Sequence, residues 1–149
     1  MKRALQLIAI LFLTISCDLS DDSDNCFTPP RQFNFDLIDA TTSENLFLNE
    51  TFTEEEIKVY DENDAEVDFD LFLYNETYIL ALKKIGWELE AKTYTIELSP
   101  EVSVVFQLDM DKVTSDSCTY FEVETFEIED YENEPDTSTG IIQVKIDLN

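Results

Sequence analysis

Residues 67–82 read VDFDLFLYNETYILAL, and they define the fold class of the chain. Apolar residues occupy every second position from Val67 to Leu73, and aspartates fill two of the positions between them. Such alternation is typical of a β-strand with one buried face. Asn75 and Glu76 separate this run from a second alternating run that completes the stretch. The spacing predicts two strands joined by a tight hairpin turn.

The same alternation recurs along the rest of the chain, with no helical periodicity after the first 16 residues. We interpret residues 46–48 as a short edge strand, and Thr53 with Glu56 as a capping box that starts one helical turn. The pattern predicts an all-β domain, an antiparallel, immunoglobulin-like (Ig-like) β-sandwich of about seven to eight strands, with a small β-barrel as the alternative. Because the chain has only two glycines, we expect Asn and Asp to supply the special turn conformations. The further alternating segments are residues 33–37, 57–60, 94–98, 102–108, 118–128 and 142–148.

One of these segments, residues 118–128, changes phase along its length. Its apolar residues alternate up to Val123 and resume out of step at Phe126. A phase change within one run predicts a β-bulge or a bend between sheets. The polar stretches at residues 112–117 and 132–140 are expected to be a turn and a loop.

The first 16 residues have the pattern of an export signal. Lys2 and Arg3 precede an uninterrupted apolar run at residues 7–13. That run matches the apolar region of a cleaved signal peptide and is too short to span a bilayer. An N-terminal amphipathic or buried helix is the alternative, but no polar face accompanies the apolar one. We therefore expect residues 1–16 to be removed on export.

Cys17 follows this apolar run directly. Residues 14–17, TISC, resemble the lipobox of bacterial lipoproteins, whose cysteine is lipidated and becomes the mature N-terminus. The acidic run at 18–24, DLSDDSD, resembles the surface-export tag of Bacteroidota-type lipoproteins, although such a run also serves as a solvated tether. The resemblance implies lipidation of Cys17, attachment to the bacterial outer membrane through that lipid, and exposure to the cell exterior. An ordinary cleaved signal followed by an incidental cysteine is the alternative.

The remainder of the chain follows from this assignment. Residues 17–30 form a lipidated acidic tether, and residues 31–149 form a single β-sandwich domain. This domain is similar to uncharacterised small β-sandwich lipoproteins, and no functional motif carries over from that resemblance.

Two cysteines remain once Cys17 is assigned to lipid. Cys26 and Cys118 would meet an oxidising compartment after export, so we predict that they form a disulfide. Two buried free thiols are the alternative. A metal site made of two cysteines is disfavoured because the chain has no histidine.

Composition excludes several classes of function. Loss of Lys2 and Arg3 leaves seven basic residues against 34 acidic ones, a net charge near −27, so no nucleic acid is expected as a partner. A 44% apolar and 12% aromatic content nevertheless indicates a folded domain. The lack of histidine removes the usual nucleophilic triads and zinc sites. No carboxylate pair is distinguished among so many acids, so we predict no catalytic residues, no cofactor and no enzymatic activity.

Two acidic segments are candidates for calcium binding. Residues 61–66, DENDAE, begin like a calcium loop, but Ala65 offers no side-chain ligand and Phe72 stands where the bidentate glutamate would be. Asp109 and Asp111 are a looser candidate pair. A solvated acidic turn is the preferred interpretation of both, and no metal site is assigned.

Trp87 and Tyr94 are the aromatic candidates for a sugar-stacking platform. The competing interpretation, which we prefer, places the single tryptophan in the core. These observations together predict a non-enzymatic, lipid-anchored cell-envelope protein that acts as a surface interaction or structural module with a protein or glycan partner. The alternative is a glycan- or calcium-binding module in nutrient capture.

Overall fold

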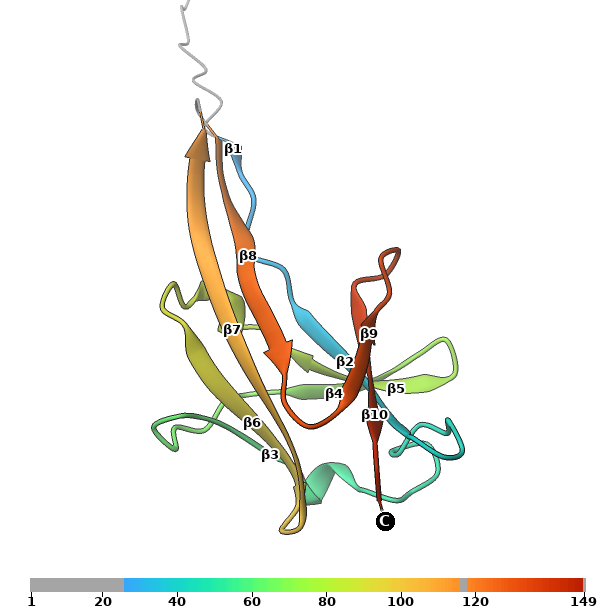
Figure 1. Cartoon of the computed structure of the whole chain (residues 1–149). Helices are drawn as coiled ribbons and strands as arrows, with labels where there is room; N and C mark the ends of the chain where they lie inside the picture. The colour runs from blue at the N-terminus through green and yellow to red at the C-terminus, as the bar shows by residue number, and fades with distance from the viewer. Residues whose placement is uncertain (1–25, 116–117, 149) are drawn as a thin grey trace, which may run out of the picture.

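The computed structural model describes residues 26–115 and 118–148, and they form two five-stranded sheets (Figure 1). The predicted all-β sandwich class is confirmed. The first sheet, in spatial order, contains β1 (Cys26–Phe27), β8 (Cys118–Ile128), β7 (Val102–Ser115), β6 (Lys92–Ser99) and β3 (Lys58–Asp61). The second contains β4 (Asp70–Tyr74), β5 (Thr77–Leu82), β2 (Phe33–Asp39), β10 (Ile141–Ile146) and β9 (Glu132–Pro135).

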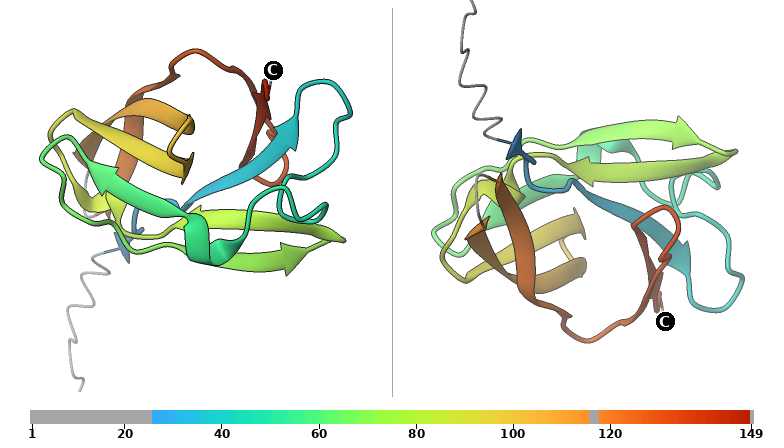
Figure 2. Two further views of the ribbon diagram at one scale, coloured as in Figure 1. Left: turned by 90° about the horizontal axis from the view of Figure 1, so that it is seen from below. Right: turned by 90° about the horizontal axis from the view of Figure 1, so that it is seen from above.

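The core lies between the inner faces of the two sheets. Phe35 of β2 is fully buried, and its ring lies 5.2 Å from that of Phe106 on β7. Phe126 of β8 joins the same group at 5.7 Å from Phe106. Each fully buried aromatic or aliphatic side chain contributes about 1.5–3 kcal/mol relative to an exposed one. Figure 2 shows the segment after β8 crossing from the first sheet to the second, which closes one side of this core.

Both sheets are mixed, which differs from the predicted antiparallel arrangement. β10 runs parallel to β2, with Ile141 opposite Asn34 and Ile146 opposite Asp39. β1 runs parallel to β8. The alternating pattern identifies a strand and its buried face, but it contains no information about the direction of the neighbouring strand.

The predicted hairpin at residues 67–82 is confirmed. β4 and β5 pair in antiparallel register around Asn75 and Glu76, whose φ angles are 46° and 68°. Two positive φ values are the signature of the type I′ turn that two-residue hairpins prefer. The strand begins only at Asp70, because the preceding residues cross to the other sheet, where the Val67 N–H donates to the Val59 carbonyl at 2.8 Å.

Turns elsewhere in the chain also adopt positive φ angles at residues other than glycine. Among the residues that the structure describes, six other than glycine have positive φ, and three of these are Asn or Asp, in partial agreement with the expectation. Thr53 and Glu56 form the predicted capping box, with the Thr53 N–H donating to Glu56 Oε2 at 3.0 Å, and the turn they start is the 3₁₀ helix η1 (Glu54–Glu56). The six non-glycine residues with positive φ are Ser43, Glu50, Asp64, Asn75, Glu76 and Asp130.

The predicted bulge lies in β8. Asp109 of β7 is opposite Thr125 and Met110 is opposite Val123, so Glu124 is the extra residue. The β7–β8 pairing continues to Ser115 opposite Cys118, so the expected polar turn at 112–117 is wrong for residues 112–115. Residues 132–135, expected as loop, form the short edge strand β9.

β7 and β8 extend beyond the rest of their sheet. β6 pairs with β7 only as far as Leu108. The remaining residues, 109–115 of β7 with 118–125 of β8, project as a two-stranded arm along which β1 lies (Figure 1). We call this segment the arm.

Residues 46–48 are not the expected edge strand. They lie in a turn organised by Asn45, a buried polar residue among the described ones. Its Nδ2 donates to Asp36 Oδ1 and to the Tyr78 carbonyl, both at 2.9 Å, while its Oδ1 accepts backbone N–H groups of the turn. These side-chain bonds replace the ladder bonds that a strand would make.

Candidate functional site

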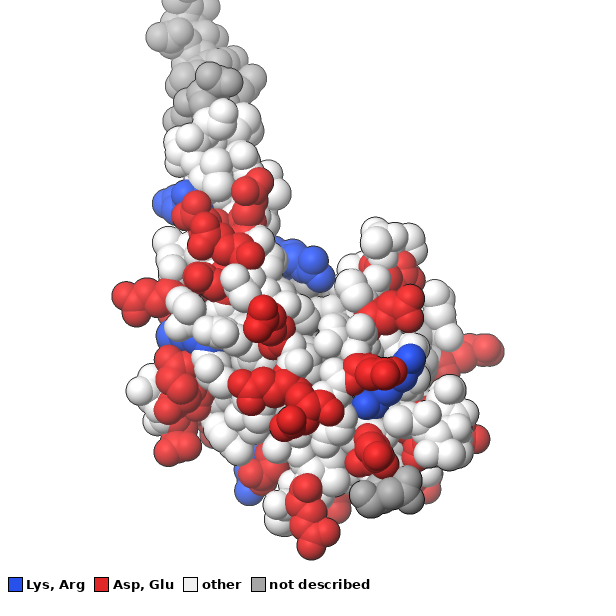
Figure 3. Space-filling view, in the orientation of Figure 1, with Lys and Arg blue, Asp and Glu red and all other residues white. Residues whose placement is uncertain are grey.

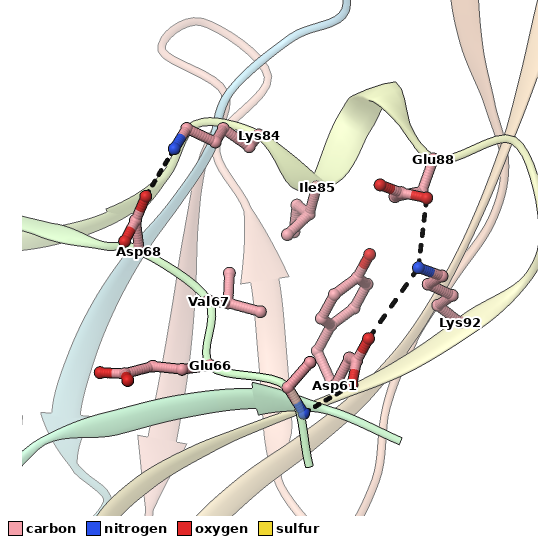
Figure 4. Close-up of a pocket in the computed structure, with 10 residues that line it drawn as sticks. Asp61, Glu66, Val67, Asp68, Lys84, Ile85, Glu88 and Lys92 are labelled. Carbon is pink, nitrogen blue, oxygen red and sulfur yellow. Dashed lines mark hydrogen bonds and ion pairs between the residues drawn. The ribbon is translucent and has the colours of Figure 1, made fainter. Parts of the chain in front are cut away.

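A pocket lined by six charged side chains lies beside β3 and β6 (Figure 4) and has a volume of about 250 Å³. Lys84 Nζ lies 2.5 Å from Asp68 Oδ2. Lys92 Nζ lies 3.1 Å from Glu88 Oε2 and 3.9 Å from Asp61 Oδ2. Both lysines are therefore matched by carboxylates, and the pocket offers no unpaired cation to an anionic ligand.

Asp61, the first residue of the candidate calcium loop, lines this pocket but is occupied by its own turn. Its Oδ1 accepts the backbone N–H groups of Asn63 and Ala65 at 2.9 and 3.0 Å. These two hydrogen bonds, chiefly that from Ala65, hold the pKa of the Asp61 carboxyl below its usual value. The arrangement is an Asx turn, which explains the Asp without a metal.

The other candidate ligands do not converge either. Asp109 and Asp111 lie in the arm, where Asp111 Oδ1 accepts the N–H of Lys112 at 2.7 Å. Within residues 26–115 and 118–148, no group of three or more carboxylate or cysteine side chains is placed to hold a metal ion.

Trp87 does not lie in the core, which corrects the preferred interpretation. It is 48% exposed in the 3₁₀ helix η2 (Ile85–Trp87), where the buried positions are taken by Ile85 and Gly86. A Cβ on Gly86 would lie 3.0 Å from the Arg31 carbonyl oxygen, so this residue packs directly on the neighbouring backbone. η2 therefore packs against the body through Ile85 and Gly86 and leaves the indole of Trp87 exposed.

Tyr94, the proposed partner of Trp87 on the surface, is instead buried. Its ring stacks on Phe106 with centroids 5.4 Å apart, and burial raises the pKa of its hydroxyl. The structure therefore does not bring Trp87 and Tyr94 together as a platform.

Trp87 has two other aromatic neighbours. Its ring centroid lies 6.1 Å from that of Phe27 at an interplanar angle of 22°, and 5.2 Å from that of Phe121 at 65°. Phe27 is 54% exposed, and Phe121 lies on β8 within the arm. We call Phe27, Trp87 and Phe121 the arm cluster. The sequence does not predict the positions of Phe27 and Phe121 in this cluster, because neither is distinguished by a local motif.

A second apolar surface lies at the edge of the other sheet. β4 pairs with β5, and the described chain places no strand on its other side. Phe72, Leu73 and Tyr74 are all exposed there, Leu73 by 60%. We call these three residues the β4 edge. A signal for it is present in the sequence, because Phe72 and Tyr74 replace the aspartates at the polar positions of the alternating run.

These two surfaces contrast with the rest of the protein. Figure 3 shows acidic side chains spread over the visible face, with few basic ones between them. Of the eight large hydrophobic residues described as exposed, five belong to the arm cluster or the β4 edge. Most of the exposed large hydrophobic residues of the described chain thus lie at two places.

The predicted disulfide is present. Cys26 and Cys118 are bonded directly across the β1–β8 pair, with their Cα atoms 4.4 Å apart. The expected signal peptide, the lipidation site Cys17 and most of the tether lie outside the described residues. No helix in the described part of the chain has the length and apolar character needed to cross a membrane.

The fold and surfaces define a class: a disulfide-linked, acidic all-β sandwich with two exposed apolar surfaces. Comparison of the chain with protein families, with curated proteins and with solved structures found no match.

Proposed function

We propose that this protein is a non-enzymatic, lipid-anchored module on the exterior of the bacterial outer membrane that binds a protein partner through the β4 edge. Lipidation of Cys17 would hold it there, as the resemblance of its first 24 residues implies. The observation that carries the binding proposal is the exposed apolar edge formed by Phe72, Leu73 and Tyr74.

An unprotected edge strand is rarely left in this state. Natural proteins cover sheet edges or place charges and prolines on them, because unpaired N–H and C=O groups recruit other strands. β4 has one charged residue, Asp70 at its first position, which pairs with Lys83. Residues 71–74, LFLY, contain neither a charge nor a proline, in a chain with 34 acidic residues. A partner strand added here would gain main-chain hydrogen bonds and apolar contacts together.

Other functions have weaker support. The chain has no histidine, and three of the four carboxylates that line the charged pocket are engaged in ion pairs or in a turn: Asp61, Asp68 and Glu88. Calcium binding would need oxygen ligands that converge, and the described carboxylates do not. Glycan binding has one observation in its favour, the exposure of Trp87 beside Phe27.

The binding proposal is tested by surface variants. Leu73→Lys places a charge on the β4 edge, and Leu89→Lys makes the same change at a comparably exposed residue outside it. We expect partners captured from the outer-membrane fraction by the wild type and by Leu89→Lys to be lost from Leu73→Lys. Equal capture by both variants would exclude the β4 edge as the binding surface.

The anchor is tested separately, on protein purified from membranes of the native host. We expect an intact mass equal to residues 17–149 plus lipid, increasing by two hydrogens on reduction of the disulfide. Protease treatment of intact cells should then cleave the protein. An unlipidated mass, or protection from protease, would contradict the anchor or its exterior orientation.

A further inference from the structure

The arm cluster lies directly beyond the chain segment that carries the proposed anchor. Phe27 follows Cys26, the first described residue, and its ring contacts both Trp87 and Phe121. The ten residues from Cys17 to Cys26 span at most about 36 Å even when fully extended. If Cys17 is lipidated, as the proposed function states, Cys26 lies within about this distance of the lipid, and Phe27 of the arm cluster is the next residue.

The arm is amphipathic across its two faces. Successive side chains of a strand point to opposite faces, so Phe121 and Glu122 project in opposite directions. Glu122 lies directly opposite Asp111 on the acidic face. Phe121 lies directly opposite Lys112 on the other face. The aromatic rings and one lysine thus share a face from which these two carboxylates are turned away.

Lys112 is unusual among the lysines of the protein. Lys58, Lys83, Lys84, Lys92 and Lys145 each form an ion pair with a carboxylate. Within the described residues, Lys112 is the one lysine without a carboxylate oxygen within 4 Å of its ammonium group. An exposed, unpaired cation beside aromatic rings matches a lipid headgroup, which presents a phosphate above an apolar layer.

A sugar fits the same rings less well. Stacking on a sugar requires a free aromatic face, but the indole of Trp87 stacks on Phe27 and is met by Phe121 at 65°. Lipid requires only exposed apolar area and amphipathic aromatics such as tryptophan, which favour the membrane interface.

We propose that the arm cluster and Lys112 dock into the headgroup region of the membrane that holds the anchor. The short tether gives the arm a local concentration of lipid surface in the millimolar range or above. A contact too weak to bind the free domain to vesicles is therefore occupied in the anchored protein. Docking of this face would fix the orientation of the domain on the membrane.

The test uses Trp87, the single tryptophan, as its probe. In the mature chain, residues 17–149, Cys17 is the free thiol when Cys26 and Cys118 are bonded, so a maleimide-linked phospholipid can be attached there. The anchored protein is incorporated into phosphatidylcholine vesicles with spin-labelled headgroups that quench indole fluorescence. The same chain with Cys17 blocked by a small maleimide provides the unanchored reference. Because this anchor is chemical, the result does not depend on lipidation in the cell.

We expect Trp87 of the anchored protein to be quenched at least threefold more than in the unanchored reference, with emission shifted to shorter wavelength. Lys112→Glu should reduce that quenching at least twofold, while Lys58→Glu, an exposed lysine on β3, should leave it unchanged. Equal quenching in the anchored and unanchored proteins would overturn the proposal. A change in Trp87 emission on adding oligosaccharide, without lipid quenching, would also overturn it in favour of a glycan surface. Equal quenching of Lys112→Glu and the wild type would refute the role of Lys112.

Discussion

The Cys26–Cys118 disulfide should be the largest single covalent contribution to stability. It closes a chain segment with a sequence separation of 92 residues. In the chain-entropy relation, a loop of this length restricts the unfolded chain by about 4.6 kcal/mol at 25 °C. Replacing both cysteines with serine removes the cross-link without leaving a reactive thiol. The two ladder pairs of β1 and the hydrogen bond from the Thr28 N–H to the Thr119 carbonyl can persist in the folded variant.

Urea unfolding of the double variant Cys26→Ser/Cys118→Ser measures this contribution. We expect the free energy of unfolding to fall by 4–5 kcal/mol, and the denaturant slope to rise because the uncross-linked unfolded chain exposes more surface. Wild-type protein held in reductant is the matched control, and it should unfold like the variant. A loss below about 1 kcal/mol in both samples would refute the chain-entropy reasoning for this bond, and would indicate that the unfolded chain is already compact.

Three further changes test the core, the buried polar turn and the acidic turn. Phe35→Ala should lower the free energy of unfolding, measured by urea titration, by about 3–5 kcal/mol. Phe72→Ala, at an exposed position, should lower it much less, and similar losses in the two variants would contradict the assigned burial. Asn45→Asp should lower the melting temperature at pH 7, because a carboxylate would replace the amide that donates to Asp36. Part of this loss should be recovered at lower pH, and a loss that does not depend on pH would disprove the explanation. The pKa of the Asp61 carboxyl is lowered in the folded state, so its ionised form stabilises the fold above the ordinary pKa of 3.8. This stabilisation is lost as the pH falls through the lowered pKa of the folded state. The wild type and Asp61→Ala should therefore differ in melting temperature at pH 7 and converge in acid.

Features that depend on local spacing could be predicted from the sequence. The hairpin at Asn75 and Glu76 follows from two alternating runs separated by a two-residue turn. The bulge at Glu124 follows from a change of phase that any strand must accommodate if both halves bury their apolar residues. The disulfide follows from the cysteine count together with the oxidising compartment that the export pattern predicts.

Features that depend on partners distant in the sequence could not be predicted from it. The parallel pairing of β10 with β2 joins segments about 100 residues apart, and neither segment encodes the direction of the other. The arm extends through Lys112 to Ser115 because β8 pairs with these polar residues, although their composition resembles a turn. Trp87 is exposed because η2 packs against the body through Ile85 and Gly86, and the spacing of residues along the sequence does not indicate which of the three would be buried.

The position of the disulfide also determines how the domain would carry mechanical force. If a bound partner pulls on the body of an anchored molecule, tension reaches the folded domain at Cys26 and passes through the sulfur atoms into Cys118, at the start of β8. The two-residue β1 ladder is thereby bypassed. The arm then transmits the tension along its strands, so the ten residue pairs between β7 and β8 resist it together in shear. Reduction of this one bond would redirect the same tension through β1, where a few hydrogen bonds could be opened one after another.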